Sequence, residues 1–283
     1  MNIAITGASG LIGSALVSFF SKSHRVTAID RQEDLASQLE HKDIIIHLAG
    51  ENVAAHRWTS LQKNKIRNSR IEGTRKLCAA IGSLKERPKI LFSASAVGYY
   101  GNRPQERLDE QSPVGGGFLA KVVQDWEREA MRAKEYGLRV VMMRFGVVLS
   151  GQGGMLARLT PLFRWGIGSS MGSGTQMMSW ISIEEVPRII DFLLRYPSLE
   201  GPFNFVSPRS VSNIEFSKTL ARTLKKPLFL RTPAFLARLA MGEMAQEVIF
   251  SSAQVLPKRL QEAGYQFKHT DLYETLLHLL KGV

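Results

Sequence analysis

The sequence is short of cysteine and of long apolar runs. Its single cysteine, Cys78, excludes a disulfide within the chain and a cysteine-based metal site. It lies in a helical pattern with Leu77 and Ile81, so we expect a small core residue. No apolar run approaches the roughly 20 residues that span a bilayer, and strand-like sequence begins at Asn2 in place of a signal peptide. We therefore expect a cytoplasmic protein without a membrane partner.

Histidine spacings that bind metals are also missing. The carboxylates form no convincing cluster, and the histidines do not recur at the intervals of known metal-binding motifs. The sequence therefore predicts no metal site. The histidines are His24, His41, His47, His56, His269 and His278.

Acidic residues are outnumbered, with 25 Asp and Glu against 37 Lys and Arg and a net charge of +12. The densest basic segment is 57–76, on an expected helix in which Glu72 alone opposes the positive charge. Aromatic residues do not alternate with these charges, and no zinc-finger, RNA-recognition or helix-turn-helix pattern accompanies them. We therefore favour a solvated face, or a face for an anionic ligand, over specific nucleic-acid binding.

A glycine-rich turn near the start organises the chain. Gly7, Gly10 and Gly13 follow the apolar run at 3–5 and precede a helical pattern that begins at Leu11. Glycines allow a tight turn, and a helix N-terminus offers unpaired N–H donors to a diphosphate. The spacing is G-x-x-G-x-x-G, so a turn that only packs a helix on a sheet is the alternative. Its position after the first strand favours a dinucleotide cofactor.

Strands and helices alternate over the first 150 residues, which predicts an α/β, Rossmann-type, doubly wound parallel sheet. Only about a dozen residues separate the second and third strands, so we expect a shortened sheet edge. We assign residues 1–150 to the nucleotide-binding domain, with sheet elements continuing to about 206. Residues 151–283 then form substrate-side loops and a smaller, mostly helical lobe. The predicted strands are 25–29, 43–46, 90–92, 139–145 and 203–206, and the main helices are 11–20, 60–84, 117–136 and 184–196.

The second strand ends at Asp30 and Arg31, which give opposite indications about the cofactor. In a dinucleotide fold this position meets the adenosine ribose, where an acid accepts from a free 2′-hydroxyl and an arginine pairs with a 2′-phosphate. Both NAD(H) and NADP(H) therefore stay open from these residues, as does a loop role for either one.

Several segments together resemble the extended short-chain dehydrogenase/reductase superfamily. Within it, the chain is similar to the epimerase-like subfamily that includes nucleotide-sugar epimerase and "cell division inhibitor" homologues. The matching segments read TGASGLIG, HLAGENV, RWTSLQKNKIRNSRIEGT, SASAVGYYG, MRFGVVLS, GSGTQMMSWISIEEV, GPFNFVSP and LPKRLQEAGYQF.

The resemblance implies a Rossmann fold, a bound nicotinamide cofactor with NADP(H) favoured, and a homodimer as one possible assembly. It also implies which residues contact the cofactor. These are Gly7, Ser9, Gly10, Leu11, Ile12, Gly13, Asp30, Arg31, Leu48, Ala49, Gly50, Arg70, Ser93 and Val147.

The catalytic pair of the superfamily is absent. Its members use Tyr-x-x-x-Lys on the helix after the serine strand, where the tyrosine transfers a proton and the lysine lowers its pKa. Here Phe118 precedes Lys121 by three residues, and phenylalanine carries no transferable proton. Ser95 matches the position that hydrogen-bonds a substrate oxygen, so Ser95 and Lys121 are the predicted catalytic residues. Tyr99 and Tyr100 are alternative acids or packing residues.

Two functions remain open from the sequence. One is an NAD(P)-dependent oxidoreductase or epimerase that acts on a small substrate, with sugars among the candidates. The glycine-rich loops in 151–180 and the C-terminal lobe would then set its specificity. The other is an NADP(H)-binding protein with a structural or sensing role that lacks the standard chemistry.

Overall fold

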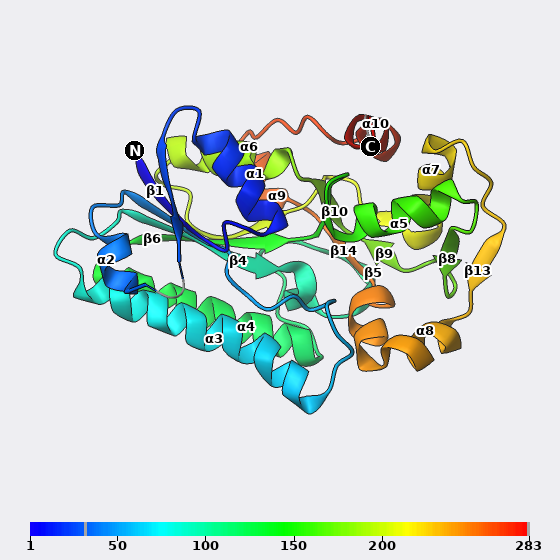
Figure 1. Cartoon of the computed structure of the whole chain (residues 1–283), viewed down its shortest axis with the longest axis horizontal. Coiled ribbons are helices and arrows are strands. Elements are labelled where there is room, and N and C mark those ends of the chain that lie inside the picture. Colours follow the sequence, from blue (N-terminus) through cyan, green and yellow to red (C-terminus); the bar gives the residue numbers. More distant parts are fainter. Residues whose placement is uncertain (31–32, 282–283) are drawn as a thin grey trace.

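The computed structural model describes residues 1–30 and 33–281 (Figure 1). Arg31, predicted to lie near the cofactor ribose, falls outside the described residues. Within the described ranges, one parallel sheet of six strands has the order β11-β6-β4-β3-β1-β2. Its strands are β1 (Asn2–Thr6), β2 (Arg25–Ile29), β3 (Ile44–His47), β4 (Ile90–Ala96), β6 (Arg139–Phe145) and β11 (Gly201–Phe205).

Helices cover both faces of this sheet (Figure 1). On one side lie α1 (Leu11–Phe20), α6 (Glu185–Arg195) and α9 (Lys258–Glu262), and on the other α2 (Leu35–Leu39), α3 (Ser60–Ser83) and α4 (Phe118–Met131). The predicted doubly wound α/β fold is therefore confirmed.

The central strands are apolar throughout because both of their faces are buried. Alternate residues point to opposite faces, so Ile3 and Ile5 pack with Leu16 of α1, while Ala4 packs with Leu77 of α3. In β3, Ile44 and Ile46 pack on the α1 side of the sheet and Ile45 packs on the α3 side.

The sheet edge next to β1 is short, as expected. Among the described residues only α2 lies between β2 and β3, and β2 forms the edge, where the common dinucleotide order 3-2-1-4-5-6 has a further strand. In the sheet, β2 lies on one side of β1 and β3 lies on the other side. The carboxyl ends of β1 and β3 thus flank the topological switch point, where such sheets bind ligands.

The second half of the chain contributes β11 to the main sheet, where it pairs with β6. Besides α6 and α9, its helices among the described residues are α5 (Gly154–Arg164), α7 (Asn213–Thr223), α8 (Ala234–Met241) and α10 (Leu272–Leu279), with a π-helical turn η3 (Ala245–Ile249). A separate core joins α5, α7 and α10 around Trp180.

The sequence analysis did not predict four short strand pairs among the described residues, and two of them, the first and the last named here, join this half to the first. The four pairs are β7 (Val147–Leu149) with β10 (Trp180–Ser182), β8 (Ser169–Met171) with β13 (Leu230–Thr232), β9 (Met177–Met178) with β12 (Val211–Ser212), and β5 (Arg103–Leu108) with β14 (Ala253–Val255). Most are two or three residues long, which is too short for a visible hydrophobic period.

In the part of the chain that the structure describes, no helix has both the length and the apolar character needed to cross a bilayer.

The contribution of the α3 interface can be measured with two leucines on the same helix. Leu77 is 1% exposed and Leu61 is 67% exposed. We expect Leu77→Ala to lower the free energy of unfolding by about 2–5 kcal/mol, because it removes buried methyl groups and leaves a cavity. Leu61→Ala should change it by less than about 0.5 kcal/mol. Urea denaturation of both variants checks this, and equal losses would contradict the assigned packing.

Candidate functional site

The glycine turn brings the start of α1 against the end of β1. Gly7 has a φ of +70°, which favours glycine, and its carbonyl accepts a hydrogen bond from the Gly10 N–H at 3.0 Å. A Cβ on Gly13 would lie 2.2 Å from the Gly7 oxygen. Gly7 and Gly13 are therefore needed for the close approach of helix and strand.

The N-terminus of α1 is open toward this turn. Gly10 is the N-cap, and among the described residues no side chain caps the helix there. Ser9 and Gly10 are exposed. Unpaired N–H groups and the positive end of the helix dipole together make an anion-binding site. Leu11 beside it closely approaches Gly153, just before α5.

The loop after β3 is fastened to the glycine turn. The Thr6 hydroxyl oxygen accepts from the N–H groups of Leu48 at 3.2 Å and Ala49 at 3.3 Å. A Cβ on Gly7 would lie 3.0 Å from the Ala49 nitrogen. The predicted cofactor segments 7–13 and 48–50 are thus adjacent at the β1/β3 switch point.

Arg70 supports the same loop from α3. One guanidinium nitrogen donates to the backbone oxygens of Glu51 at 2.9 Å and Ile66 at 3.1 Å, and the group lies over the Trp126 ring. Burial lowers the pKa of Arg70 to about 10, with partial compensation from Glu51. These contacts give Arg70 a role in holding the loop.

The other predicted cofactor residues lie on neighbouring strands. Asp30 is exposed at the end of β2, where its backbone N–H and carbonyl bond the Gln38 amide. Ser93 is fully buried in β4, beside His47 in the strand register, and Val147 is half-buried in β7. Their cofactor roles stay predictions, as do those of the glycine turn and its loop.

Ser95 is 3% exposed and belongs to a buried polar network. Its hydroxyl donates to the Glu127 carboxylate at 2.5 Å. The guanidinium of Arg144 forms two hydrogen bonds of 2.8 Å to the same carboxylate and a third, at 2.9 Å, to the Tyr100 hydroxyl. Tyr100 in turn donates to Asn204 at 2.8 Å. The network joins β4, α4, β6 and β11.

The charge states of Arg144 and Tyr100 follow from their burial and from their hydrogen-bond partners. Burial opposes the charge of Arg144, but the Glu127 carboxylate outweighs it and holds the pKa of Arg144 above its usual range. Burial raises the pKa of Tyr100 to about 12, so this phenol stays protonated at neutral pH.

The hydroxyl proton of Ser95 is donated to Glu127, and this bond limits the hydrogen bonds that the Ser95 oxygen can make to a substrate. A hydroxyl has one proton and two lone pairs, so Ser95 in this arrangement can accept a hydrogen bond. It would therefore orient a substrate hydroxyl more readily than it would polarise a carbonyl. Lys121 is exposed on α4. The catalytic roles of Ser95 and Lys121 stay predictions.

A carboxylate from the C-terminal half caps α4, which the sequence did not reveal. The two Glu247 oxygens accept from the N–H groups of Phe118 and Leu119, each at 3.0 Å. Beside this cap, Gly98, Leu119 and Gln246 line a hollow of about 80 Å³. Glu247 follows Phe118 by more than a hundred residues, so no local pattern signals the contact.

These features define a Rossmann-type α/β protein with an uncapped helix N-terminus at the β1/β3 switch point, where such sheets bind ligands. A model of the NAD dependent epimerase/dehydratase family matches residues 3–206, and a model of a domain of unknown function, DUF1731, matches residues 232–279. The chain belongs to the NAD dependent epimerase/dehydratase family, within the extended short-chain dehydrogenase/reductase superfamily.

Relatives match over nearly the whole length. "Epimerase family protein Mb2239" of Mycobacterium bovis is 40% identical, over 97% of this chain and 96% of its own. "Epimerase family protein SA0724" of Staphylococcus aureus is 36% identical, over 98% of each. The crystal structure of human epimerase family protein SDR39U1 with NADPH superposes with a TM-score of 0.93 at 29% identity, and the match covers 100% of both chains.

The buried ion pair can be tested by neutralising its carboxylate. We expect Glu127→Gln to lower the free energy of unfolding by about 3–5 kcal/mol, because it leaves the Arg144 charge uncompensated. The matched change Glu215→Gln removes an exposed pair with Arg209 and should cost at most about 1 kcal/mol. Denaturant titrations compare the two, and similar costs would refute a special role for the buried pair.

Proposed function

We propose that the chain binds NADP(H) and acts as an oxidoreductase or epimerase-like enzyme on a small, sugar-like substrate. The observation that carries this proposal is the open N-terminus of α1 above the Gly7–Gly13 turn, at the switch point of the sheet. The human relative that was crystallised with NADPH, at 29% identity over the full chain, supports the choice of cofactor.

The glycines of the first turn would let the backbone approach a dinucleotide closely. Side chains at Gly7 and Gly13 would strike the neighbouring backbone, so these glycines keep the turn tight. The turn and the first N–H groups of α1 would hold the diphosphate, and Asp30 with Arg31 would meet the adenosine ribose. Leu48, Ala49 and Gly50 would border the same crevice. The cofactor would supply a hydride donor or acceptor.

The substrate-side chemistry would start from Ser95. Since the Ser95 proton is bonded to Glu127, the serine oxygen would accept from a substrate hydroxyl and fix its orientation. Lys121 and Tyr99 are the proposed proton-handling groups. Tyr99 is half-buried, and the Arg144 guanidinium lies 3.6 Å from its ring centre.

A second candidate is cofactor binding without turnover, in a structural or sensing role. It is favoured by the commitment of Ser95 to a buried network, together with the absence of the Tyr-x-x-x-Lys pair. The two candidates share the cofactor site and differ only in whether hydride reaches a substrate.

Cofactor choice can be measured by titrating nucleotide-stripped protein with NADPH and NADH while following nicotinamide fluorescence. We expect tighter binding of NADPH, and about a tenfold or greater loss in Arg31→Ala, because a charge-assisted bond to the 2′-phosphate disappears. Arg209→Ala, which alters an exposed arginine in the loop between β11 and β12, is the control. A preference for NADH that Asp30→Ala abolishes would make Asp30 the ribose acceptor, and binding of neither nucleotide would refute the proposal.

Turnover separates the two candidates. The protein is screened with NADPH and NADP⁺ against nucleotide sugars and small carbonyl and hydroxyl compounds. We expect Ser95→Ala to retain NADPH binding and to lower kcat by about 10²-fold or more, because orientation of the substrate oxygen is lost. Ser18→Ala, an exposed serine on α1, should leave kcat unchanged. Binding of NADPH without exchange of hydride across the panel would favour the sensing role.

A further inference from the structure

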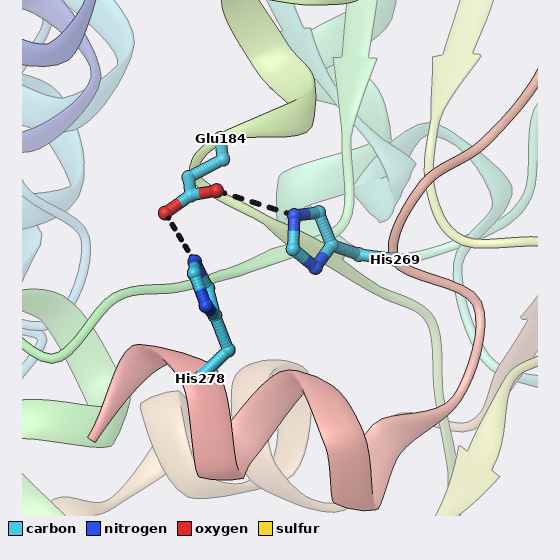
Figure 2. A group of neighbouring side chains, drawn as sticks. All are labelled: Glu184, His269 and His278. Carbon is cyan, nitrogen blue, oxygen red and sulfur yellow. Dashed lines mark hydrogen bonds and ion pairs between the residues drawn. The ribbon is translucent and has the colours of Figure 1, made fainter. Parts of the chain in front are cut away.

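Three side chains from separate parts of the chain converge beside α6. Glu184 immediately precedes α6, His269 lies in the segment before α10, and His278 is in the last turn of α10. Figure 2 shows the two imidazoles turned toward the two oxygens of the Glu184 carboxylate. The sequence predicted no metal site because 85 residues separate the glutamate from the nearer histidine, and only the fold brings them together.

The distances suit one ion between the three groups. Glu184 Oε1 lies 2.8 Å from His278 Nε2, and Glu184 Oε2 lies 3.3 Å from His269 Nε2. One ligand atom from each residue falls within 4.8 Å of the others. Bonds of about 2.0–2.1 Å in a tetrahedral site place neighbouring ligand atoms about 3.3 Å apart. Small side-chain shifts would therefore complete the geometry.

His269 gives independent support for a ligand here. It is 8% exposed, and its buried Nε2 atom lies 3.3 Å from the Glu184 carboxylate as an ion pair but makes no hydrogen bond of good geometry among the described residues. A buried polar atom of this kind costs free energy unless something satisfies it. An ion held jointly with Glu184 would do so.

The neighbouring glutamate fixes the position of His269. Glu185 is fully buried, and its carboxylate accepts from the backbone N–H groups of Lys268 and His269 at 2.5 and 2.8 Å and from the Tyr265 hydroxyl at 2.5 Å. Such bonds hold the histidine segment against the start of α6. Outer contacts of this type orient metal ligands in proteins.

Donor type and exposure indicate the class of ion. Two imidazoles and a carboxylate suit Zn²⁺ and similar transition metals, whereas Ca²⁺ and Mg²⁺ prefer oxygen ligands throughout. The side chains of Glu184 and His278 are 44% and 49% exposed, so water can reach a remaining coordination position. We propose that Glu184, His269 and His278 bind one divalent transition-metal ion of the zinc type, which links α10 to α6.

The test uses the full chain, freed of metal by dialysis against a chelator. Zn²⁺ is titrated by calorimetry, Co²⁺ is titrated as a spectroscopic substitute, and thermal unfolding is followed with and without Zn²⁺. We expect one saturable site and a thermal midpoint that rises with Zn²⁺ concentration, because an ion that binds the folded state stabilises it.

Single-ligand variants give the decisive comparison. His278→Gln and Glu184→Gln alter exposed positions and should weaken Zn²⁺ binding at least about tenfold. His41→Asn is the matched control, since His41 pairs with Glu86 at an exposed site without a second histidine, and it should leave binding unchanged. Absence of saturable binding to the unaltered chain, or affinity unaffected by both ligand variants, would overturn the proposal. Cofactor binding is not involved in either outcome.

Discussion

The buried ion pair between Glu127 and Arg144 is the interaction on which the arrangement of strands and helix around Ser95 depends. Strand β6 brings a guanidinium into the interior, where an unpaired charge is strongly disfavoured. Helix α4 supplies the carboxylate, and Ser95, Tyr100 and Asn204 complete the hydrogen bonds. One paired charge thereby fixes the relative positions of β4, β6, β11 and α4.

A second polar network secures the cofactor side. His47 lies within 2.7 Å of the Thr6 hydroxyl and 3.0 Å of the Thr74 hydroxyl, which also accepts from the Trp126 indole at 2.9 Å. Trp126 and Glu127 are successive residues of α4, so the two networks meet on that helix. The glycine turn and the Ser95 region are therefore both connected to α4 through hydrogen bonds.

The main fold was predictable because its signals are local. Both faces of β3 are buried, which makes Ile44, Ile45 and Ile46 a continuous apolar run, and the glycines of the first turn are dictated by backbone contacts. Strands β5 and β14 were not predicted, since their pairing joins segments about 150 residues apart and most of β5 is exposed.

The candidate site was predictable only in part, because several of its contacts join residues that are far apart in the sequence. Ser95 was identified through the family resemblance, but its bond to Glu127 depends on how α4 packs against β4. The cap from Glu247 and the cluster of Glu184 with two histidines join residues that are remote in sequence. These contacts could not be predicted from the sequence, because their residues are far apart in the chain and no periodic pattern links them.

The cap that Glu247 makes on α4 shows whether the chain can be separated into two independent modules. The two family models match 3–206 and 232–279, which invites a view of two modules. Yet the second region caps α4 of the first, and the Asn204 amide donates to the backbone oxygen of Leu256 at 2.9 Å. A fragment that ended near residue 206 would expose the first N–H groups of α4 and remove a partner of Asn204. The two regions therefore satisfy each other's backbone and side-chain hydrogen bonds, and each depends on the other for its structure.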